Sequence, residues 1–358
     1  MISDLLSQIL YLSIKSYTDF IMMSKTVLFL ITILWFVPVM VVGLPGFLWA
    51  EMGPLHVQNR YPLYLMFLTP EPDTPKLIEP GQWQVSLTAD YTSVYINEQS
   101  SDWSVLMDME MIILDLGLTY GLTPHVNLAL TVPWISMQAG FLDGPLGTYH
   151  EIFGFPDYGR PDRPENEYGY HMVVNNEDWV DGQSGGLHLG ETVIAAKLDL
   201  IGTERSQGFA SSLSAALKVP TGDVEKGFGS GRHDQFLVLL NRYRLSPISL
   251  YLNPGYVWLS DPDSKDADIQ VDDMVTLFVG LEWEVFQNLS GISQLNYMTS
   301  PLSHTRIPQL DQDSLELVLG LCYSPYEHVV LEAAFSENLT RSAPDFTLHG
   351  GLRWTFGH

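Results

Sequence analysis

A two-residue alternation of polar and apolar side chains limits the fold more than any other feature of the sequence. It begins at Gln82 and recurs to the end of the chain, as in QWQVSLTADY (82–91) and SLELVLGLCY (314–323). Such alternation is typical of a strand with one polar and one apolar face. We predict twelve strands with the approximate limits 82–95, 104–120, 125–138, 187–201, 208–220, 233–245, 248–259, 271–286, 289–299, 313–324, 327–337 and 345–356.

The connections between these strands alternate in length. The short ones lie near 121–124, 202–207, 246–247, 287–288 and 325–326, and the others are longer. An even strand number with short turns on one side and long loops on the other is the pattern of a bacterial outer-membrane barrel. We therefore predict an all-β, transmembrane antiparallel β-barrel of about 12 strands with periplasmic N- and C-termini. A soluble sandwich or lipocalin-like barrel would bury its apolar face, and it leaves the loop asymmetry unexplained.

Composition narrows the functional classes. The 358 residues carry 42 acidic and 17 basic side chains, for a formal net charge of −25. A nucleic-acid binder would be basic, and a disordered acidic chain would lack the 12% aromatic residues. The single cysteine, Cys322, excludes a disulfide framework and a multi-cysteine metal site.

The N-terminal region contains an uncharged apolar run at 27–49, preceded by Lys25. Prolines and glycines interrupt this run, which favours a cleaved secretory signal over a membrane-spanning helix. We predict that 1–50 form an N-terminal extension and signal peptide. Residues 51–81 are rich in proline and are expected to form a periplasmic segment or a plug that enters the lumen from below. Residues 82–358 would be the barrel, with a long outer loop at 139–186.

Charged residues on the polar strand faces are expected to line the lumen, because charges facing lipid are destabilising. An acidic lumen favours cations. Alternatively, the carboxylates pair with basic residues or with inward-folded loops and merely fill the barrel. Within 104–120 the charged residues change from one alternating set of positions to the other, so we expect a bulge there. The predicted lumen residues are Asp90, Asp108, Glu110, Asp115, Glu191, Lys197, Asp199, Lys218, Glu282, Glu284, Glu316, Glu332 and Arg353.

The long connection 139–186 is a second candidate site, because long loops without secondary structure are usually functional or disordered and this one is rich in aromatics. We hypothesise that it forms a constriction or a ligand lid at the outer mouth, and the alternative is a surface cap. The aromatics concerned are Phe153, Phe155, Tyr158, Tyr168, Tyr170 and Trp179.

Motifs for catalysis and metal binding are weak. GQSGG (182–186) fits G-x-S-x-G around Ser184, but that motif requires a strand-to-helix turn in an α/β sheet. In GSGRHD (229–234) the serine, histidine and aspartate are too close along an extended chain to form a relay. The acidic loop at 260–270 is expected to be solvated. We predict no enzyme activity, no metal and no cofactor.

Several motifs carry a family resemblance. GPLHVQNRYPL (53–63), YGLTPHVNLALTVPW (120–134), LKVPTGD (217–223), GSGRHD and DFTLHGGLRWTF (345–356) together resemble the bacterial outer-membrane family called domain of unknown function 3187. More distantly they are similar to outer-membrane transporters linked to aromatic-compound degradation. The resemblance implies a porin-like barrel without an established substrate. The ending resembles the strand signal that the barrel-assembly machinery recognises, carried by His349, Gly351, Trp354 and Phe356.

Together these features predict a channel in the outer membrane of a Gram-negative bacterium that lets small solutes diffuse and favours cations. One alternative is a plugged barrel that transports a hydrophobic or aromatic solute. Another is a structural barrel or sheath around a secreted or redox partner. The expected partners are outer-membrane lipid and lipopolysaccharide, the barrel-assembly machinery and a small-molecule solute, with no nucleic acid.

Overall fold

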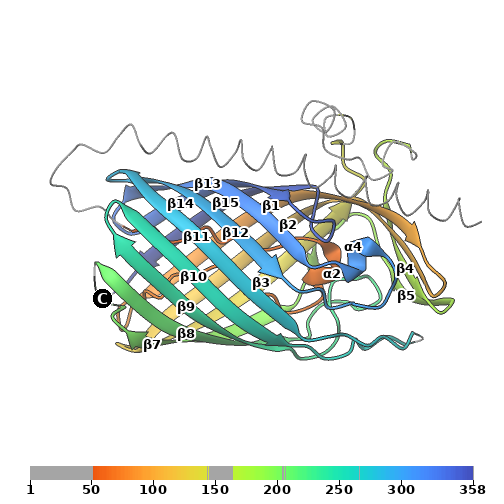
Figure 1. The fold of residues 1–358 in the computed structure, drawn as a ribbon, viewed down its shortest axis with the longest axis horizontal. Coiled ribbons are helices and arrows are strands. Elements are labelled where there is room, and N and C mark those ends of the chain that lie inside the picture. Colours follow the sequence, from red (N-terminus) through yellow and green to blue (C-terminus); the bar gives the residue numbers. More distant parts are fainter. Residues whose placement is uncertain are drawn as a thin grey trace, which may run out of the picture. The chain divides into compact units, whose positions relative to one another are not determined.

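Twelve strands form a closed antiparallel β-barrel (Figure 1), because each pairs with its neighbour and β2 closes the ring against β3. The computed structural model describes residues 51–142, 144, 164–203, 205, 207–265 and 267–357. The barrel strands are β1 (Trp83–Gln99), β2 (Trp103–Thr123), β3 (Val126–Gln138), β7 (Thr192–Ile201), β8 (Gly208–Val219), β9 (Gln235–Leu245), β10 (Ile248–Trp258), β11 (Met274–Phe286), β12 (Leu289–Met298), β13 (Ser314–Tyr326), β14 (Val329–Asn338) and β15 (Phe346–Phe356).

The predicted twelve-strand barrel is confirmed, and most strand limits agree to within a few residues. The short connections gather at one end, called the turn end below, and the long ones at the other, called the loop end. The described residues contain only two short helices, α2 (Pro62–Leu65) and α4 (Pro308–Asp311). Neither has the length or the apolar character to cross a membrane.

The connection after β3 differs from the expected loop, because it contains strands of its own. These are β4 (Gly169–Val174), β5 (Glu177–Asp181) and β6 (His188–Leu189). β4 pairs with the loop-end extension of β2, Trp103–Asp108, and β5 pairs with β4. The sequence analysis missed this hairpin because it treated the whole of 139–186 as loop, and it included β6 in the strand predicted at 187–201.

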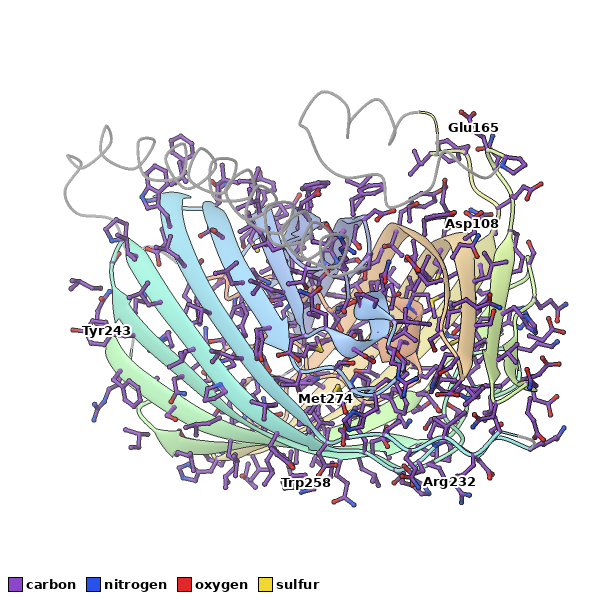
Figure 2. All side chains as sticks on the ribbon, turned by 45° about the vertical axis from the view of Figure 1, so that its right-hand side comes forward. Asp108, Glu165, Arg232, Tyr243, Trp258 and Met274 are labelled. Atoms are coloured by element: carbon purple, nitrogen blue, oxygen red, sulfur yellow. The ribbon has the colours of Figure 1, made fainter. Side chains whose placement is uncertain are left out.

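The outer face of the barrel is apolar. On β9 to β11 the exposed side chains alternate with buried ones, and the exposed positions are mostly leucine and valine. Figure 2 shows Tyr243 and Trp258 on the outside of the wall, where they are 53% and 44% exposed. Exposed aromatics cluster at the turn end, as in an interfacial girdle. They include Trp83, Phe209, Phe286, Tyr323, Trp354 and Phe356.

The interior contains residues 51–81, which we call the lumen segment. Its first part, residues 51–60, runs from the turn end along the inner face of β11 to β15 and is called the anchored limb. Residues 61–68, which include α2, form the tip near the loop end. Residues 69–80 return to the turn end and are called the strap, and Gly81 then bonds to Gly121 beside the start of β1.

Candidate functional site

The backbone of the lumen segment bonds mainly to side chains on the inner wall. Prolines remove several amide donors from this stretch, so it cannot join the sheet as a regular strand. The amide and carbonyl of Leu55 bond to the Gln294 side chain on β12, both at 3.1 Å. Asn296 donates to the Val57 carbonyl at 3.0 Å, and Glu282 accepts from the Met52 amide at 3.0 Å. Inward polar side chains thus satisfy backbone groups that would otherwise be buried without partners.

Arg60 is the central anchor of the segment and is 2% exposed. Its Nε donates to Asp90 Oδ2 on β1 at 2.6 Å, and its Nη2 donates to Asp115 Oδ2 on β2 at 2.5 Å. The other oxygen of Asp90 lies 2.6 Å from His349 Nδ1 on β15. One guanidinium therefore joins the lumen segment to two strands by charge-assisted bonds.

Further ion pairs secure the anchored limb towards the turn end. Glu332 on β14 accepts from the His56 amide at 3.1 Å and lies 2.7 Å from Arg353 Nε. Glu51 pairs with Arg242 and lies 3.7 Å from Arg244, both on β9. The anchored limb is therefore bonded to the barrel along its whole length.

The tip is held by a buried lysine. Lys218 on β8 is fully buried, and its Nζ donates to the Met66 carbonyl at 2.8 Å and to Ser230 Oγ at 2.6 Å. The same ammonium lies 2.7 Å from Asp234, which also accepts from the Leu68 amide at 3.0 Å. Lys218, Ser230 and Asp234 come from the motifs LKVPTGD and GSGRHD, so both motifs contribute to fixing the tip.

Around the tip lies an apolar cluster at the loop end. Tyr64 and Leu63 are 1% exposed there. The cluster also contains Tyr170 and Trp179 of the β4–β5 hairpin and eight methionines. Methionine side chains are flexible and fill irregular space. The tip and this cluster close the loop end of the lumen.

The strap makes fewer contacts with the wall. The Asp73 amide bonds to Asn253 on β10 at 3.2 Å. Lys197 on β7 lies 2.5 Å from the Asp73 carboxylate and donates to the carbonyls of Thr74 at 3.0 Å and Lys76 at 3.4 Å. One lysine therefore provides most of the polar attachment of the strap to the barrel.

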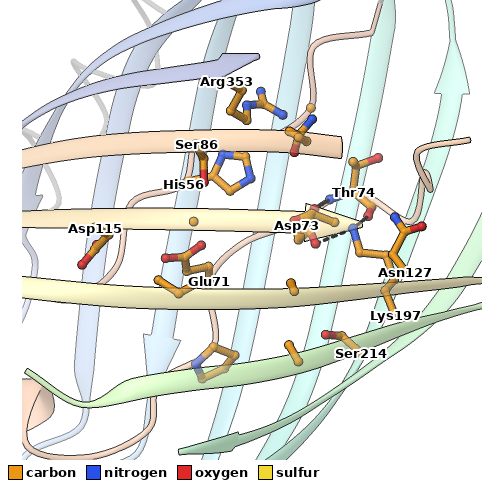
Figure 3. Close-up of a pocket in the computed structure, with 18 of the residues that line it drawn as sticks. His56, Glu71, Asp73, Thr74, Ser86, Asp115, Asn127, Lys197, Ser214 and Arg353 are labelled. Carbon is orange, nitrogen blue, oxygen red and sulfur yellow. Dashed lines mark hydrogen bonds and ion pairs between the residues drawn. The ribbon is translucent and has the colours of Figure 1, made fainter. Parts of the chain in front are cut away.

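A cavity of about 970 Å³ separates the lumen segment from the wall formed by β1 to β3 and β7 to β9. Figure 3 shows Ser86, Asn127 and Ser214 on the wall, across from Glu71, Asp73 and Thr74 on the strap. The cavity extends from exposed turn-end residues such as Glu79 and His328 to the buried Leu68 and Lys218 below the tip. Among the described residues that line it, acidic and basic side chains are equally numerous.

Most of the predicted lumen carboxylates are buried beside partners. Glu191 accepts three backbone amides of the 221–230 region, the nearest at 2.8 Å, and lies between β6 and β7. Glu282 bonds to Tyr251 at 2.6 Å, and Glu284 bonds to Arg244 at 2.5 Å. Glu316 is 1% exposed. Asp199 lies at the turn end and accepts from Thr203 at 2.8 Å; Thr203 lines the cavity, whereas Asp199 does not.

The expected positions of Asp108 and Glu110 are wrong. β1 and β2 pair without a register shift from Trp83–Tyr120 to Gln99–Ser104, so the predicted bulge is absent. Asp108 and Glu110 therefore face the opposite side of the sheet from Asp115. Glu110 is buried there because it accepts from Tyr91 on the outer face and from the amides of Phe141 and Leu142, at 2.8 and 2.5 Å.

The predicted outer-loop aromatics divide into two groups. Tyr170 and Trp179 are buried in the loop-end cluster, at 2% and 3% exposure, and Tyr168 packs against it. Phe153, Phe155 and Tyr158 lie outside the described residues, as do 1–50. Of the predicted assembly signal, Trp354 and Phe356 face outward and are exposed, whereas His349 is buried inside the barrel. Gly351 borders the cavity.

The sequence analysis missed several residues that hold the segment, above all Arg60, His56, Asp234 and Gln294. An arginine in a segment that enters an acidic barrel was the available signal for Arg60. The residues of GSGRHD do meet, but around Lys218, and His233 Nδ1 lies 3.0 Å from the Lys218 carbonyl. This arrangement is structural, because Ser230 and Asp234 contact the Lys218 ammonium whereas His233 contacts the Lys218 backbone.

Solved structures of outer-membrane channels and porins are similar to this chain at low sequence identity. The COG4313 outer membrane channel from Pseudomonas putida F1 is 16% identical, with a TM-score of 0.51 over 78% of this chain and 97% of that one. The NanC porin is 6% identical, with a TM-score of 0.42 over 75% and 98%. A mutant of the TodX monoaromatic hydrocarbon channel is 12% identical, with a TM-score of 0.37 over 78% and 90%.

At 16% identity, the likeness to the COG4313 channel concerns the fold alone. No curated protein matches the chain. A sequence family, by contrast, matches over most of the length, from residue 38 to residue 356. The chain belongs to the family described as protein of unknown function DUF3187.

Proposed function

We propose that this protein is an outer-membrane channel for small solutes, and that the lumen segment gates it. The apolar outer face and the turn-end aromatics suit a barrel embedded in lipid with its turn end in the periplasm. Such a channel works without covalent chemistry and without a cofactor. The β15 side chains that face outward, Trp354 and Phe356, would serve the assembly machinery and lipid contacts.

The observation that carries the proposal is the cavity beside the lumen segment. A volume of about 970 Å³ inside a twelve-stranded barrel is large enough for a small organic solute. The cavity is lined at the turn end by exposed residues and ends below the buried tip. In this arrangement solute has access from the turn end, and movement of the tip and strap would connect the cavity to the loop end.

A cation preference is expected because the lumen segment neutralises carboxylates on the inner wall. With the segment in place, Arg60 compensates Asp90 and Asp115. In a barrel that lacks residues 51–80, these carboxylates and Glu282 would face the lumen without the segment's partners. Such a pore would be more acidic than one that keeps the anchored limb, and it would favour cations.

A second candidate is transport of an apolar solute. The observation in its favour is the methionine-rich cluster at the loop end, because flexible thioether side chains can rearrange around apolar molecules. Under this hypothesis the solute would enter through the cluster and no ion current would accompany it.

Single-channel current across a planar bilayer with a salt gradient tests the proposal. The full chain is compared with a variant that lacks residues 51–80, and folding is verified by the heat-dependent shift in electrophoretic mobility. We expect rare openings of the full chain and a steady, cation-selective current from the variant. A folded variant that carries no current would contradict the channel. If the variant does not fold, Lys197→Met, which frees the strap alone, should raise the opening frequency of the full-length barrel.

A further inference from the structure

Glu71 stands apart from the other charged residues inside the barrel. It lies on the strap between Pro70 and Pro72, whose rings restrict the backbone on both sides. Its carboxylate borders the cavity (Figure 3). The basic residues around the interior of the cavity already have carboxylate partners: Arg60, Lys197, Lys218, Arg242, Arg244 and Arg353. Glu71 has no hydrogen-bond or ion-pair partner within the described part of the chain.

The charges around Glu71 leave an excess of negative charge. Arg60 is the permanent cation that acts on the Glu71 carboxylate, but its guanidinium is shared by Asp90 and Asp115. The other titratable neighbours are His56 and Asp73 of the lumen segment and Asp115 of β2. Burial raises the pKa of Glu71 to about 7, and this effect outweighs the opposing influence of His56 and Arg60. A carboxylate in such surroundings is stabilised by an added cation.

The opposite wall provides uncharged hydrogen-bonding groups. Ser86, Asn127 and Ser214 face the cavity from β1, β3 and β8, and alanines 129 and 195 also line it. Lys197, which is already paired with Asp73, lies between Asn127 and Ser214 on this wall. This surface suits the polar, uncharged body of a small molecule, with its charged group at Glu71. Neither the size nor the ligands suit a metal ion, because the described residues contain no group of three or more metal-binding side chains.

We propose that Glu71 binds the ammonium group of a small organic cation whose polar body lies against Ser86, Asn127 and Ser214. The proposal rests on the channel function and names the solute class for the same cavity. The bound cation would replace the missing partner of Glu71 and would favour the ionised carboxylate. Because the strap carries Glu71, the bound solute would also contact the part of the segment that is least attached to the barrel.

Calorimetric titration of the full chain in detergent with choline tests this site, with propionate as the anionic probe. We expect choline to bind one site and propionate not to bind. Glu71→Gln should weaken choline binding by at least about tenfold, since it removes one partner of an enclosed charge pair. Glu79→Gln is the matched control, because Glu79 is an exposed carboxylate of the same strap. Glu71→Asp should restore part of the affinity.

The pH dependence adds a second readout. Choline affinity should fall as the pH is lowered through about 7 in the wild type, as protonation neutralises Glu71. In Glu71→Gln it should be flat. Equal choline binding by wild type and Glu71→Gln would overturn the site, and so would binding of propionate. Displacement of choline by equimolar Mg²⁺ or K⁺ would assign the site to an inorganic cation and would overturn the organic assignment.

Current measurements on the same preparations separate this site from the channel itself. One outcome is that the variant without residues 51–80 conducts while the folded full chain never binds choline. That outcome would retain the channel and overturn the site. Choline binding that depends on Glu71, in a barrel whose segment-deleted form carries no current, would support the site and contradict the channel.

Discussion

The two limbs of the lumen segment are attached to the barrel in different ways. The anchored limb bonds to the wall through its backbone and through Glu51, His56 and Arg60. The strap, which is slightly longer, is attached mainly at Asp73, Thr74 and Lys76, with Lys197 as the chief partner. Prolines 70, 72, 75 and 80 also deprive the strap of amide donors.

This difference indicates how the lumen segment can fill the barrel and still open, since one of its limbs can move while the other stays bound. Local opening requires few buried apolar contacts and few bonds to the rest of the fold. Leu55 in the anchored limb is fully buried, whereas Lys76 and Glu79 of the strap are exposed. We therefore expect the strap to open far more often than the anchored limb. Hydrogen exchange of backbone amides, followed by mass spectrometry, measures both limbs in the same sample.

The largest expected effect comes from Arg60→Gln. The substitution leaves the buried Asp90 and Asp115 without their cation, which should cost about 3–5 kcal/mol. Exchange at the Leu55 amide should accelerate by about two to four orders of magnitude, and the contrast between the limbs should vanish. Arg205→Gln is the control, because Arg205 also lines the cavity but is exposed. Similar acceleration by both variants would contradict the anchoring role of Arg60.

The next largest effect is expected in the pH dependence of hydrogen exchange in the strap. Glu71 has a pKa of about 7 in place and 4.5 as its ordinary value, so the closed strap holds the proton more tightly than the open one. Its stabilising contribution is complete below about 4.5, declines as the pH rises and is lost above about 7. Strap exchange should therefore accelerate between these values, relative to Glu71→Gln at each pH. A constant ratio would show that Glu71 does not titrate in this range.

A smaller effect is expected for Lys197→Met. The ion pair with Asp73 is partly exposed, at 15% and 29% for the two side chains, so its loss should cost about 1 kcal/mol. Strap exchange should rise about fivefold while exchange at Leu55 stays unchanged. The exchanged pair Lys197→Asp with Asp73→Lys should recover much of the difference. If the double variant exchanges as fast as Lys197→Met, the pairing of charges is not what holds the strap.

The barrel could be predicted from sequence because alternation and loop length are local properties. The alternation within each strand reveals the apolar face that contacts lipid. A series of antiparallel hairpins then requires only that segments adjacent in sequence pair with each other. The one wrong phase, at Asp108 and Glu110, arose because both carboxylates are buried on the outer side, where Glu110 accepts from Tyr91 and from the amides of residues 141–142. Sequence alternation cannot distinguish that burial from burial in the lumen.

The partners inside the lumen could be predicted only in part. The density of prolines in 51–81 indicated a segment outside the sheet and a possible plug. Pairing of Arg60 with Asp90 and Asp115, or of Lys218 with Asp234 and Met66, joins residues far apart in the sequence that meet only when the barrel closes. Their spacing carries no periodic signal, so the sequence showed an acidic lumen but did not identify its cations.

The smallest effect is expected from a disulfide that fixes the anchored limb to the barrel, because this limb should not move during opening. Cys322 on β13 is buried in the same cluster as Met52 and Leu55 of the anchored limb. Met52→Cys provides a partner for a disulfide with Cys322, and Leu55→Cys provides a second position. Because only the tip and strap should move during opening, the oxidised protein should keep the strap exchange rate and the current of the reduced one. Met52→Cys with Cys322→Ala controls for the oxidant. Loss of current on oxidation, reversed by reductant and absent in this control, would mean that the whole segment leaves the lumen as one unit.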